Sequence, residues 1–327
     1  MDRLDMALGR EAGVNAPEPD RRAVVLMALG GPTSLADVEP YLRDLRGGRP
    51  TPPELVDEFR ERYRRIGGGS PLVAVTRSQA AALERRLEGS TAAARCEFGM
   101  RHWRPSIVDA VRRLVDDGYR DLTGLCLTPY YSAWSVGGYH AALRAAVAEV
   151  DPSVRIRPVD HWHDAPTLAP AFAERIVGRR AAMAERGFPD PRILFTAHSL
   201  PGVTDPEREP YVLELAETRR EIERRAGPMR SRMAYQSVGR REGPWLGPPA
   251  EGEIERLAAE GEGSVLVVPY GFVSDNLEIL FDVDLEMRDL AGRLGLGFER
   301  TDSLNDDPLL IEALAHAVRR AVPADGP

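Results

Sequence analysis

Short apolar runs alternate with helical segments along nearly the whole chain, and this alternation limits the folds that are available. Seven runs have the length of a strand and are continuously apolar, which is typical of strands buried on both faces of a parallel sheet. They are residues 23–29, 94–100, 122–128, 154–159, 193–198, 233–237 and 264–270. Eight segments of helical character fall between them, at residues 35–45, 53–65, 73–87, 106–116, 138–149, 167–185, 206–225 and 251–260. This order predicts a doubly wound α/β fold with parallel sheets.

The length of the chain and the spacing of these segments indicate two domains. Seven strands over 327 residues fit two α/β units better than one. No long linker rich in proline, glycine or serine separates the halves, so we expect the two domains to pack closely with a cleft between them. We predict a disordered leader at residues 1–21, a first domain at 22–130 together with a C-terminal helix at 305–322, and a second domain at 131–304.

The basic residues of the sequence are all arginine, since none of the 43 lysine and arginine positions is a lysine. This absence excludes a Schiff-base lysine, a pyridoxal phosphate enzyme and a Walker-type phosphate loop. A G+C-rich genome is the simplest explanation of the arginine usage. Arginine nevertheless binds carboxylates through a two-pronged fork, so anionic substrates remain open. The net charge of -8 gives no general basis for binding nucleic acid.

The sequence carries no feature of a membrane or secreted protein. No window approaches eighteen consecutive apolar residues, so we expect no transmembrane helix. Residues 1–20 lack the apolar core of a signal peptide. The two cysteines, Cys96 and Cys126, lie in apolar runs and are too few for a disulfide framework or a structural zinc or iron–sulfur site. We therefore expect a cytoplasmic protein.

Polar and aromatic side chains gather where the predicted strands end. In parallel folds, ligands bind outside the carboxyl ends of the strands. The residues at these ends include Arg101, His102, Trp103, Tyr130, Tyr131, Ser132, His198 and Tyr270. Such a rim suits a large, flat, aromatic ligand that carries carboxylates. Gly30 and Gly31 lack the third spaced glycine of a dinucleotide loop, so they predict a close approach of the backbone to this flat ligand.

His198 closes an apolar run and is followed by Ser199, Leu200 and Pro201. An isolated histidine at such a position is most often a satisfied core residue. Here Pro201 ends the strand and leaves the imidazole at the mouth of the loop. A neutral imidazole in that place can bind a divalent metal or accept a proton near neutral pH.

Glu278, Asp282 and Glu286 are spaced four residues apart on a predicted helix. Charges with this spacing usually form a solvated helix face. Here bulky apolar residues surround the acids and no arginine lies within the run before Arg288, so we expect a path for a metal or for protons. A row of step four drifts around an α-helix, and a π-type turn would align it better.

His161 and His163 flank Trp162, and two interpretations of the pair stay open. Residues two apart on a strand face the same way, so the two imidazoles could hold a metal together. The same geometry arises by default in any strand, and we expect the pair to be structural or to lie at the rim.

Several motifs, in order along the chain, resemble those of the ferrochelatases. They are LGGP at 29–32, YRRIGGGSPL at 63–72, GMRHW at 99–103, TAHSLP at 196–201, YQS at 235–237, PWLGP at 244–248 and GFVSD at 271–275. The resemblance extends from about residue 23 to about residue 322. It implies two similar Rossmann-like domains of the class II chelatase type with a porphyrin cleft between them, and insertion of Fe²⁺ into a porphyrin in heme biosynthesis.

The same resemblance implies roles for particular residues. His198 and Glu278 would be the catalytic pair that handles the metal and the protons, and Asp282 and Glu286 would continue the acidic path. No cofactor is required, because Fe²⁺ is itself a substrate. The residues that would hold propionates are Arg46, Arg62, Tyr63, Ser70 and Tyr139.

The short, charged stretch at residues 41–55 resembles the soluble enzymes of monoderm bacteria, which act on coproporphyrin III. This resemblance implies coproheme as the product and a coproheme decarboxylase as a possible downstream partner. The nearest alternative is the same chemistry on protoporphyrin IX. More distant alternatives are a cobalt chelatase for sirohydrochlorin and a tetrapyrrole carrier that is not an enzyme.

Two positions depart from the pattern of the soluble branch. Leu29 stands where a tyrosine able to ligate the product iron is usual, so axial ligation would fall to another residue, with His198 as the first candidate. Asn276 stands where histidine is more frequent. Its amide can orient Glu278 but cannot titrate, so we expect no second basic group there.

Overall fold

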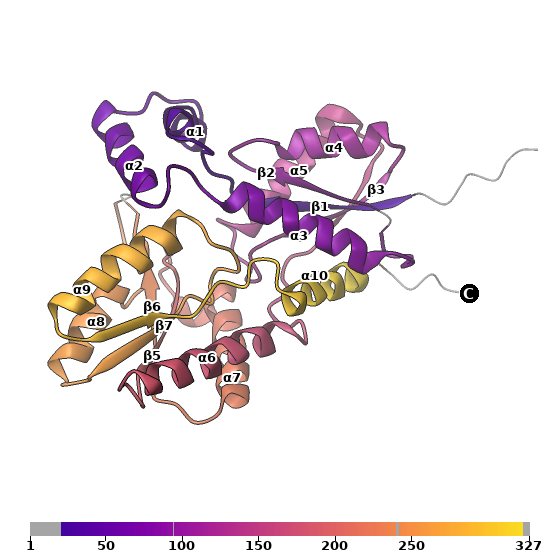
Figure 1. The fold of residues 1–327 in the computed structure, drawn as a ribbon. Coiled ribbons are helices and arrows are strands. Elements are labelled where there is room, and N and C mark those ends of the chain that lie inside the picture. Colours follow the sequence, from indigo (N-terminus) through magenta and orange to yellow (C-terminus); the bar gives the residue numbers. More distant parts are fainter. Residues whose placement is uncertain (1–20, 94, 240–241, 323–327) are drawn as a thin grey trace, which may run out of the picture.

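The chain folds around two four-stranded sheets in which every strand pair is parallel (Figure 1). This computed structural model describes residues 21–93, 95–239 and 242–322, so nearly all of the predicted leader lies outside the described residues. The first sheet has the order β2-β1-β3-β4 and the second has the order β6-β5-β7-β8. The strands are β1 Arg22–Ala28, β2 Arg95–Met100, β3 Asp121–Cys126, β4 Arg155–Pro158, β5 Arg192–His198, β6 Ser231–Gln236, β7 Ser264–Val268 and β8 Gly297–Arg300. The predicted α/β fold with parallel sheets is confirmed.

Helices cover both sheets, and most lie where the sequence predicts them. The α-helices are α1 Val38–Leu45, α2 Pro53–Arg65, α3 Leu72–Leu87, α4 Ile107–Asp116, α5 Val136–Val150, α6 Leu168–Glu185, α7 Pro210–Ala226, α8 Ala250–Ala259, α9 Arg288–Arg293 and α10 Pro308–Ala321. A π-helix, η3 Glu278–Met287, leads into α9. The predicted helices at 35–45 and 206–225 begin with short 3₁₀ turns, η1 Leu35–Asp37 and η2 Pro206–Arg208.

The side chains of β1 show why the strands have continuous apolar sequences. Val25 and Met27 face α4 and α5 on one side of the first sheet, whereas Val24 and Leu26 face α3 and α10 on the other. In the second sheet, one face packs on α8, η3 and α9 and the other on α6 and α7. Both faces are thus buried, so both sets of alternating residues are apolar.

The largest apolar cluster runs through both halves of the molecule. It joins the α3 face of the first sheet to the α6 face of the second, and α10 contributes to it as well. Figure 1 shows α10 beside α3 and α6, and α10 contacts both helices and β3. The predicted close packing of the two halves therefore depends on this shared core.

The strand pairing places the division between the halves later than residue 130. β4 pairs with β3, with Asp121 opposite Arg155 and Gly124 opposite Pro158. The predicted boundary between residues 130 and 131 would thus separate β4 from its own sheet. The pairing of strands is a long-range property, and the short, mostly polar β4 carries no local sign of the sheet to which it belongs.

Neither a membrane span nor a disulfide is found in the part of the chain that the structure describes. No described helix is both long enough and apolar enough to cross a bilayer. Cys96 and Cys126 are both buried and both have free thiols. Burial is the main reason that the pKa of each thiol lies above its usual value, so both are held in the unreactive protonated form.

Candidate active site

His198 is the last residue of β5, and a pair of loops holds the backbone that follows it. The Ser199 hydroxyl donates to the carbonyl of Leu246 at 2.8 Å, and the Leu246 N–H donates to Leu200 at 3.1 Å. Leu246 is the middle residue of the PWLGP motif, so this rigid segment fixes the turn out of the strand. The predicted ending of the strand at His198 is confirmed.

The imidazole of His198 is partly buried and has one ring nitrogen in use. Its Nδ1 lies 2.5 Å from the carbonyl oxygen of Ser199, so Nδ1 carries the proton and donates. Among the described residues, Nε2 has no hydrogen-bond partner. The Phe272 ring lies edge-on to the imidazole with centroids 6.2 Å apart. The Nε2 lone pair is consequently available to a metal or a proton.

Gly271 brings Phe272 close to His198. A Cβ atom at Gly271 would lie only 2.6 Å from the Cα of Ala197, so no larger residue fits without a shift of the backbone. The Gly271 N–H also donates to the carbonyl of Thr196 at 3.1 Å. The glycine of the GFVSD motif is therefore explained by this close contact with β5.

The three spaced acids occupy a π-helix, the turn expected to align them better than an α-helix. Glu278 begins η3, and Asp282 and Glu286 follow within the same element. The wider π turn keeps positions four apart nearer to one line than an α-helix does. Their exposure differs, since Asp282 is buried, Glu278 is partly buried and Glu286 is exposed.

Glu278 presents an unpaired carboxylate to a group of buried tyrosines. No hydrogen bond or ion pair to its side chain is found among the residues that the structure describes. The pKa of the Tyr41, Tyr63 and Tyr139 hydroxyls is raised mainly by burial and, in part, by the negative charge of Glu278. These hydroxyls therefore stay protonated and can act as hydrogen-bond donors to an anion.

Asp282 has partners from two distant segments. The Ser237 hydroxyl donates to Oδ2 at 2.5 Å, and a guanidinium nitrogen of Arg62 lies 3.7 Å from Oδ1. The run itself offers no arginine before Arg288, and α2 supplies Arg62 as the basic partner of Asp282. Burial raises the pKa of Asp282 to about 7, and the charge of Glu278 adds to this while Ser237 and Arg62 oppose it.

This raised pKa predicts a pH-dependent stability. The usual value for the carboxyl is 3.8, so between about pH 4 and pH 7 the folded chain holds a proton that the unfolded chain has lost. The free energy of unfolding therefore falls as the pH rises through this window. Asp282→Asn stays neutral, and we expect it to reduce the loss of stability between pH 5 and pH 8 by about 1–3 kcal/mol.

Urea unfolding at several pH values measures this effect. Asp289→Asn is the matched control, since Asp289 is exposed on the adjoining α9. An Asp282→Asn profile parallel to that of the wild type would contradict the prediction.

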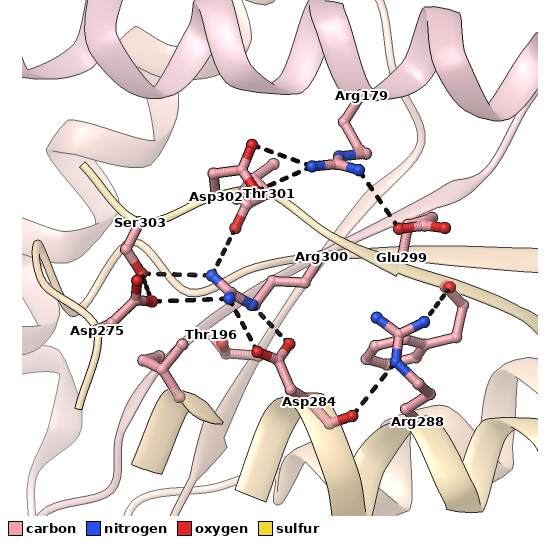
Figure 2. Close-up of polar contacts among 12 residues, drawn as sticks. Arg179, Thr196, Asp275, Asp284, Arg288, Glu299, Arg300, Thr301, Asp302 and Ser303 are labelled. Atoms are coloured by element: carbon pink, nitrogen blue, oxygen red, sulfur yellow. Dashed lines mark hydrogen bonds and ion pairs between the residues drawn. The ribbon is translucent and has the colours of Figure 1, made fainter. Parts of the chain in front are cut away.

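A network centred on Arg300 binds η3 through Asp284 (Figure 2). Arg300 of β8 grips Asp284 with two hydrogen bonds, at 2.7 Å from Nε and 2.9 Å from the terminal nitrogen. It also lies 3.6 Å from Asp275. The Ser303 hydroxyl and the Asn305 amide donate to the two oxygens of Asp275. The acidic motif around Asp275 thus positions the segment that leads to Glu278, a role that the sequence did not reveal.

The predicted propionate residues lie directly after α1, on α2 and α5, and in the turn before α3. Tyr63 and Tyr139 are buried near Glu278. Arg62 is paired with Asp282 and also with Glu58 at 3.1 Å. These contacts show that Arg62 is engaged with the acidic row.

Ser70 and Arg46 differ from Arg62 in their surroundings. Ser70 packs against the backbone of Gly31, where a Cβ atom would meet its side chain at 2.6 Å. The close approach at Gly31 is thus made to a side chain of the protein itself. Arg46 directly follows α1, and its Nε is buried without a hydrogen-bond partner. Among the described residues its guanidinium forms no ion pair.

An apolar cluster links α1 and α2 to the acidic helix. Val38, Tyr41 and Leu42 of α1 pack in it with Val56 and Tyr63 of α2. The same cluster contains Leu277 and Phe281, and the Arg62 guanidinium lies over the Phe281 ring at 5.0 Å. The two N-terminal helices are consequently held against η3.

Sequence comparison finds relatives that match almost the whole chain. A family model described as ferrochelatase matches residues 21–322. A ferrochelatase of Deinococcus radiodurans is 37% identical over 299 residues, covering 91% of this chain and 95% of the relative. A coproporphyrin III ferrochelatase of Geobacillus kaustophilus is 35% identical over 306 residues, covering 93% and 96%.

Comparison with solved structures bears on the fold. SirB from Bacillus subtilis, solved with Fe³⁺, matches with a TM-score of 0.58 and covers 93% of this chain and 96% of its own. The sequence identity of that pair is 13%. The two-sheet architecture is therefore shared with a chelatase structure of very different sequence.

Proposed function

The chain belongs to the ferrochelatase family, and on that premise we propose that its porphyrin substrate is coproporphyrin III, which it converts to coproheme. The metal ion that it inserts is Fe²⁺, a substrate and not a resident cofactor. The named Geobacillus relative supports this choice of porphyrin. The Deinococcus relative has the broader name, so the choice rests also on the residues around the site.

The observation that supports metal insertion is the unpaired, partly buried carboxylate of Glu278 at the start of η3. A porphyrin must lose two N–H protons before Fe²⁺ can enter its plane. Glu278 is the group that accepts them, and Asp282, with a pKa of about 7, exchanges protons easily near neutral pH. Glu286 is exposed and releases them to solvent. Protons would thus pass from the partly buried Glu278 through Asp282 to the exposed Glu286 and into solvent.

His198 supplies the complementary chemistry. Its Nε2 lone pair is a ligand of intermediate softness, which suits ferrous iron and still allows its release. The hydrogen bond from Nδ1 to Ser199 fixes the tautomer that leaves Nε2 free. No redox step is required, because iron enters and leaves the site in the ferrous state.

Four propionates distinguish coproporphyrin from protoporphyrin IX, which has two. Among the predicted propionate residues we assign Arg46 to one of the additional carboxylates, since its buried Nε lacks a hydrogen-bond partner. A ligand carboxylate would satisfy that donor through a charge-assisted hydrogen bond. Tyr63, Ser70 and Tyr139 add neutral donors. Arg62 would serve a propionate only by sharing its guanidinium with Asp282.

Arg46→Ala tests the substrate assignment. A buried, charged hydrogen bond contributes about 1.5–3 kcal/mol, so we expect coproporphyrin III to bind roughly tenfold or more weakly. Protoporphyrin IX has vinyl groups in place of two propionates, so its affinity should fall less. Fluorescence quenching with each porphyrin measures both constants.

Arg43→Ala is the matched control, because Arg43 lies in the last turn of α1, is exposed and is already paired with Glu39 at 3.2 Å. It should leave both affinities unchanged. Arg62→Ala should also weaken coproporphyrin III, although it additionally removes the cation beside Asp282. If Arg46→Ala lowered the affinity for both porphyrins equally, Arg46 would not be the residue that binds an additional propionate of coproporphyrin III.

A further inference from the structure

A second cluster of metal-binding side chains lies apart from His198 and Glu278. Its members are His161, His163 and Glu214, whose donor atoms all lie within 4.8 Å of one another. The histidines belong to the segment that follows β4, whereas Glu214 comes from α7. None of the three is a residue of the candidate active site.

Trp162 anchors the segment that carries both histidines. Its indole nitrogen donates to the carbonyl of Cys126 at 2.9 Å, and its side chain is 1% exposed. The imidazoles of His161 and His163 lie with ring centroids 5.0 Å apart, and both approach Glu214 of α7. The sequence predicts that the two histidines face the same way, but it gives no sign that Glu214 lies opposite.

The hydrogen bonds of His163 leave a lone pair directed at a carboxylate. Its Nε2 lies 3.1 Å from Glu217, so this nitrogen carries the proton and donates. Its Nδ1 is buried without a hydrogen-bond partner and lies 3.6 Å from Oε2 of Glu214. When the ring is neutral, Nδ1 and the Glu214 oxygen are both acceptors and face each other, and the His163 side chain is only 6% exposed. A cation between them would relieve this unfavourable arrangement.

The carboxylate of Glu214 is held in place by contacts to both of its oxygens. Its Oε2 accepts a hydrogen bond from the backbone N–H of Tyr131 at 2.6 Å. Its Oε1 lies 2.8 Å from Nδ1 of His161. Both carboxylate oxygens are therefore fixed, and each one faces an imidazole nitrogen.

We propose that His161, His163 and Glu214 form a second binding site for a borderline divalent transition metal such as Zn²⁺ or Fe²⁺. Two imidazoles and one carboxylate are a donor set typical of these ions. Glu217 acts as the outer carboxylate that orients the ring of His163. A pocket of about 270 Å³, lined by His163, Asp164, Glu217 and Thr218 among others, adjoins the site and admits water as a further ligand.

The site would connect the two halves of the enzyme. Its histidines follow the last strand of the first sheet, and its carboxylate lies on a helix that packs on the second. Tyr211, three residues before Glu214 on α7, donates a hydrogen bond to the carbonyl of His198 at 3.1 Å. A metal bound to Glu214 would hold α7, and through Tyr211 the end of β5.

Zn²⁺ titration without porphyrin tests the site independently of the proposed function. The His198→Ala background removes a metal ligand of the candidate active site. Chelator-treated full-length protein is titrated with Zn²⁺ against a chromophoric chelator. We expect one equivalent to bind in His198→Ala and to be lost when His163→Ala or Glu214→Gln is added. Glu217→Gln should weaken that equivalent by about 10–100-fold.

Glu214→Gln keeps an oxygen acceptor for Tyr131, so it remains informative if His163→Ala does not fold. His316→Ala is the matched control, because His316 lies on α10 outside the cluster. It should retain the Zn²⁺ equivalent. Retention of that equivalent in both ligand variants, or its absence in His198→Ala alone, would overturn the site and leave the porphyrin proposal untouched.

Discussion

His198→Ala is expected to abolish iron insertion while the porphyrin still binds. The variant removes the Nε2 lone pair, which no described residue uses, and leaves the backbone at the end of β5 in place through Ser199 and Leu246. General acid–base and ligand functions of a positioned histidine contribute about 10²–10⁴-fold to rate, so we expect a loss at the upper end of this range.

The measurement combines two assays on the same preparation. Anaerobic Fe²⁺ is mixed with coproporphyrin III and the change in porphyrin absorbance gives the rate, while fluorescence quenching gives the affinity. His316→Ala serves as the control for removal of a histidine. Turnover of His198→Ala at the wild-type rate would remove His198 from the mechanism.

Glu278→Gln is expected to cause the second large loss, in kcat and with little change in porphyrin affinity. The amide keeps the shape of the side chain but can no longer accept a pyrrole proton. We expect kcat to fall by about 10²–10⁴-fold. Asp282→Asn and Glu286→Gln should have smaller effects, because these residues pass the proton on after it has left the porphyrin.

The ranking of the three variants is the informative outcome. Single-turnover rates for all three, measured at the same pH, give it directly. If Asp282→Asn or Glu286→Gln proved more harmful than Glu278→Gln, the proposed direction from sheltered base to solvent would be reversed.

The fold could be predicted where local patterns carry it. The strand β7 is buried at every residue and is made of valine and leucine after its first residue, so its apolar run identifies it. β8 was missed because Phe298 is the only large apolar side chain in its four residues. The order of strands in each sheet is set by pairing between distant segments, so the division between the halves was placed too early.

In the candidate site, too, local features could be predicted and long-range contacts could not. The position of His198 at a strand end and the alignment of Glu278, Asp282 and Glu286 on a π-helix were visible as local patterns. The partners of these residues were not, since Arg62 precedes Asp282 by more than two hundred positions. The same holds for Glu214 opposite the two histidines. A sequence shows which side chains can do chemistry, whereas only the fold shows which of them lie close enough to interact.

The place of α10 has a consequence for the order in which the chain folds during synthesis. α10 covers α3, and Arg86 of α3 is paired with Glu312 of α10, 226 positions later. The side of α3 that α10 covers therefore stays exposed while the ribosome makes the whole second sheet. The first sheet cannot reach its final packing before α10 emerges, so nascent chains that lack α10 should be the species that chaperones retain.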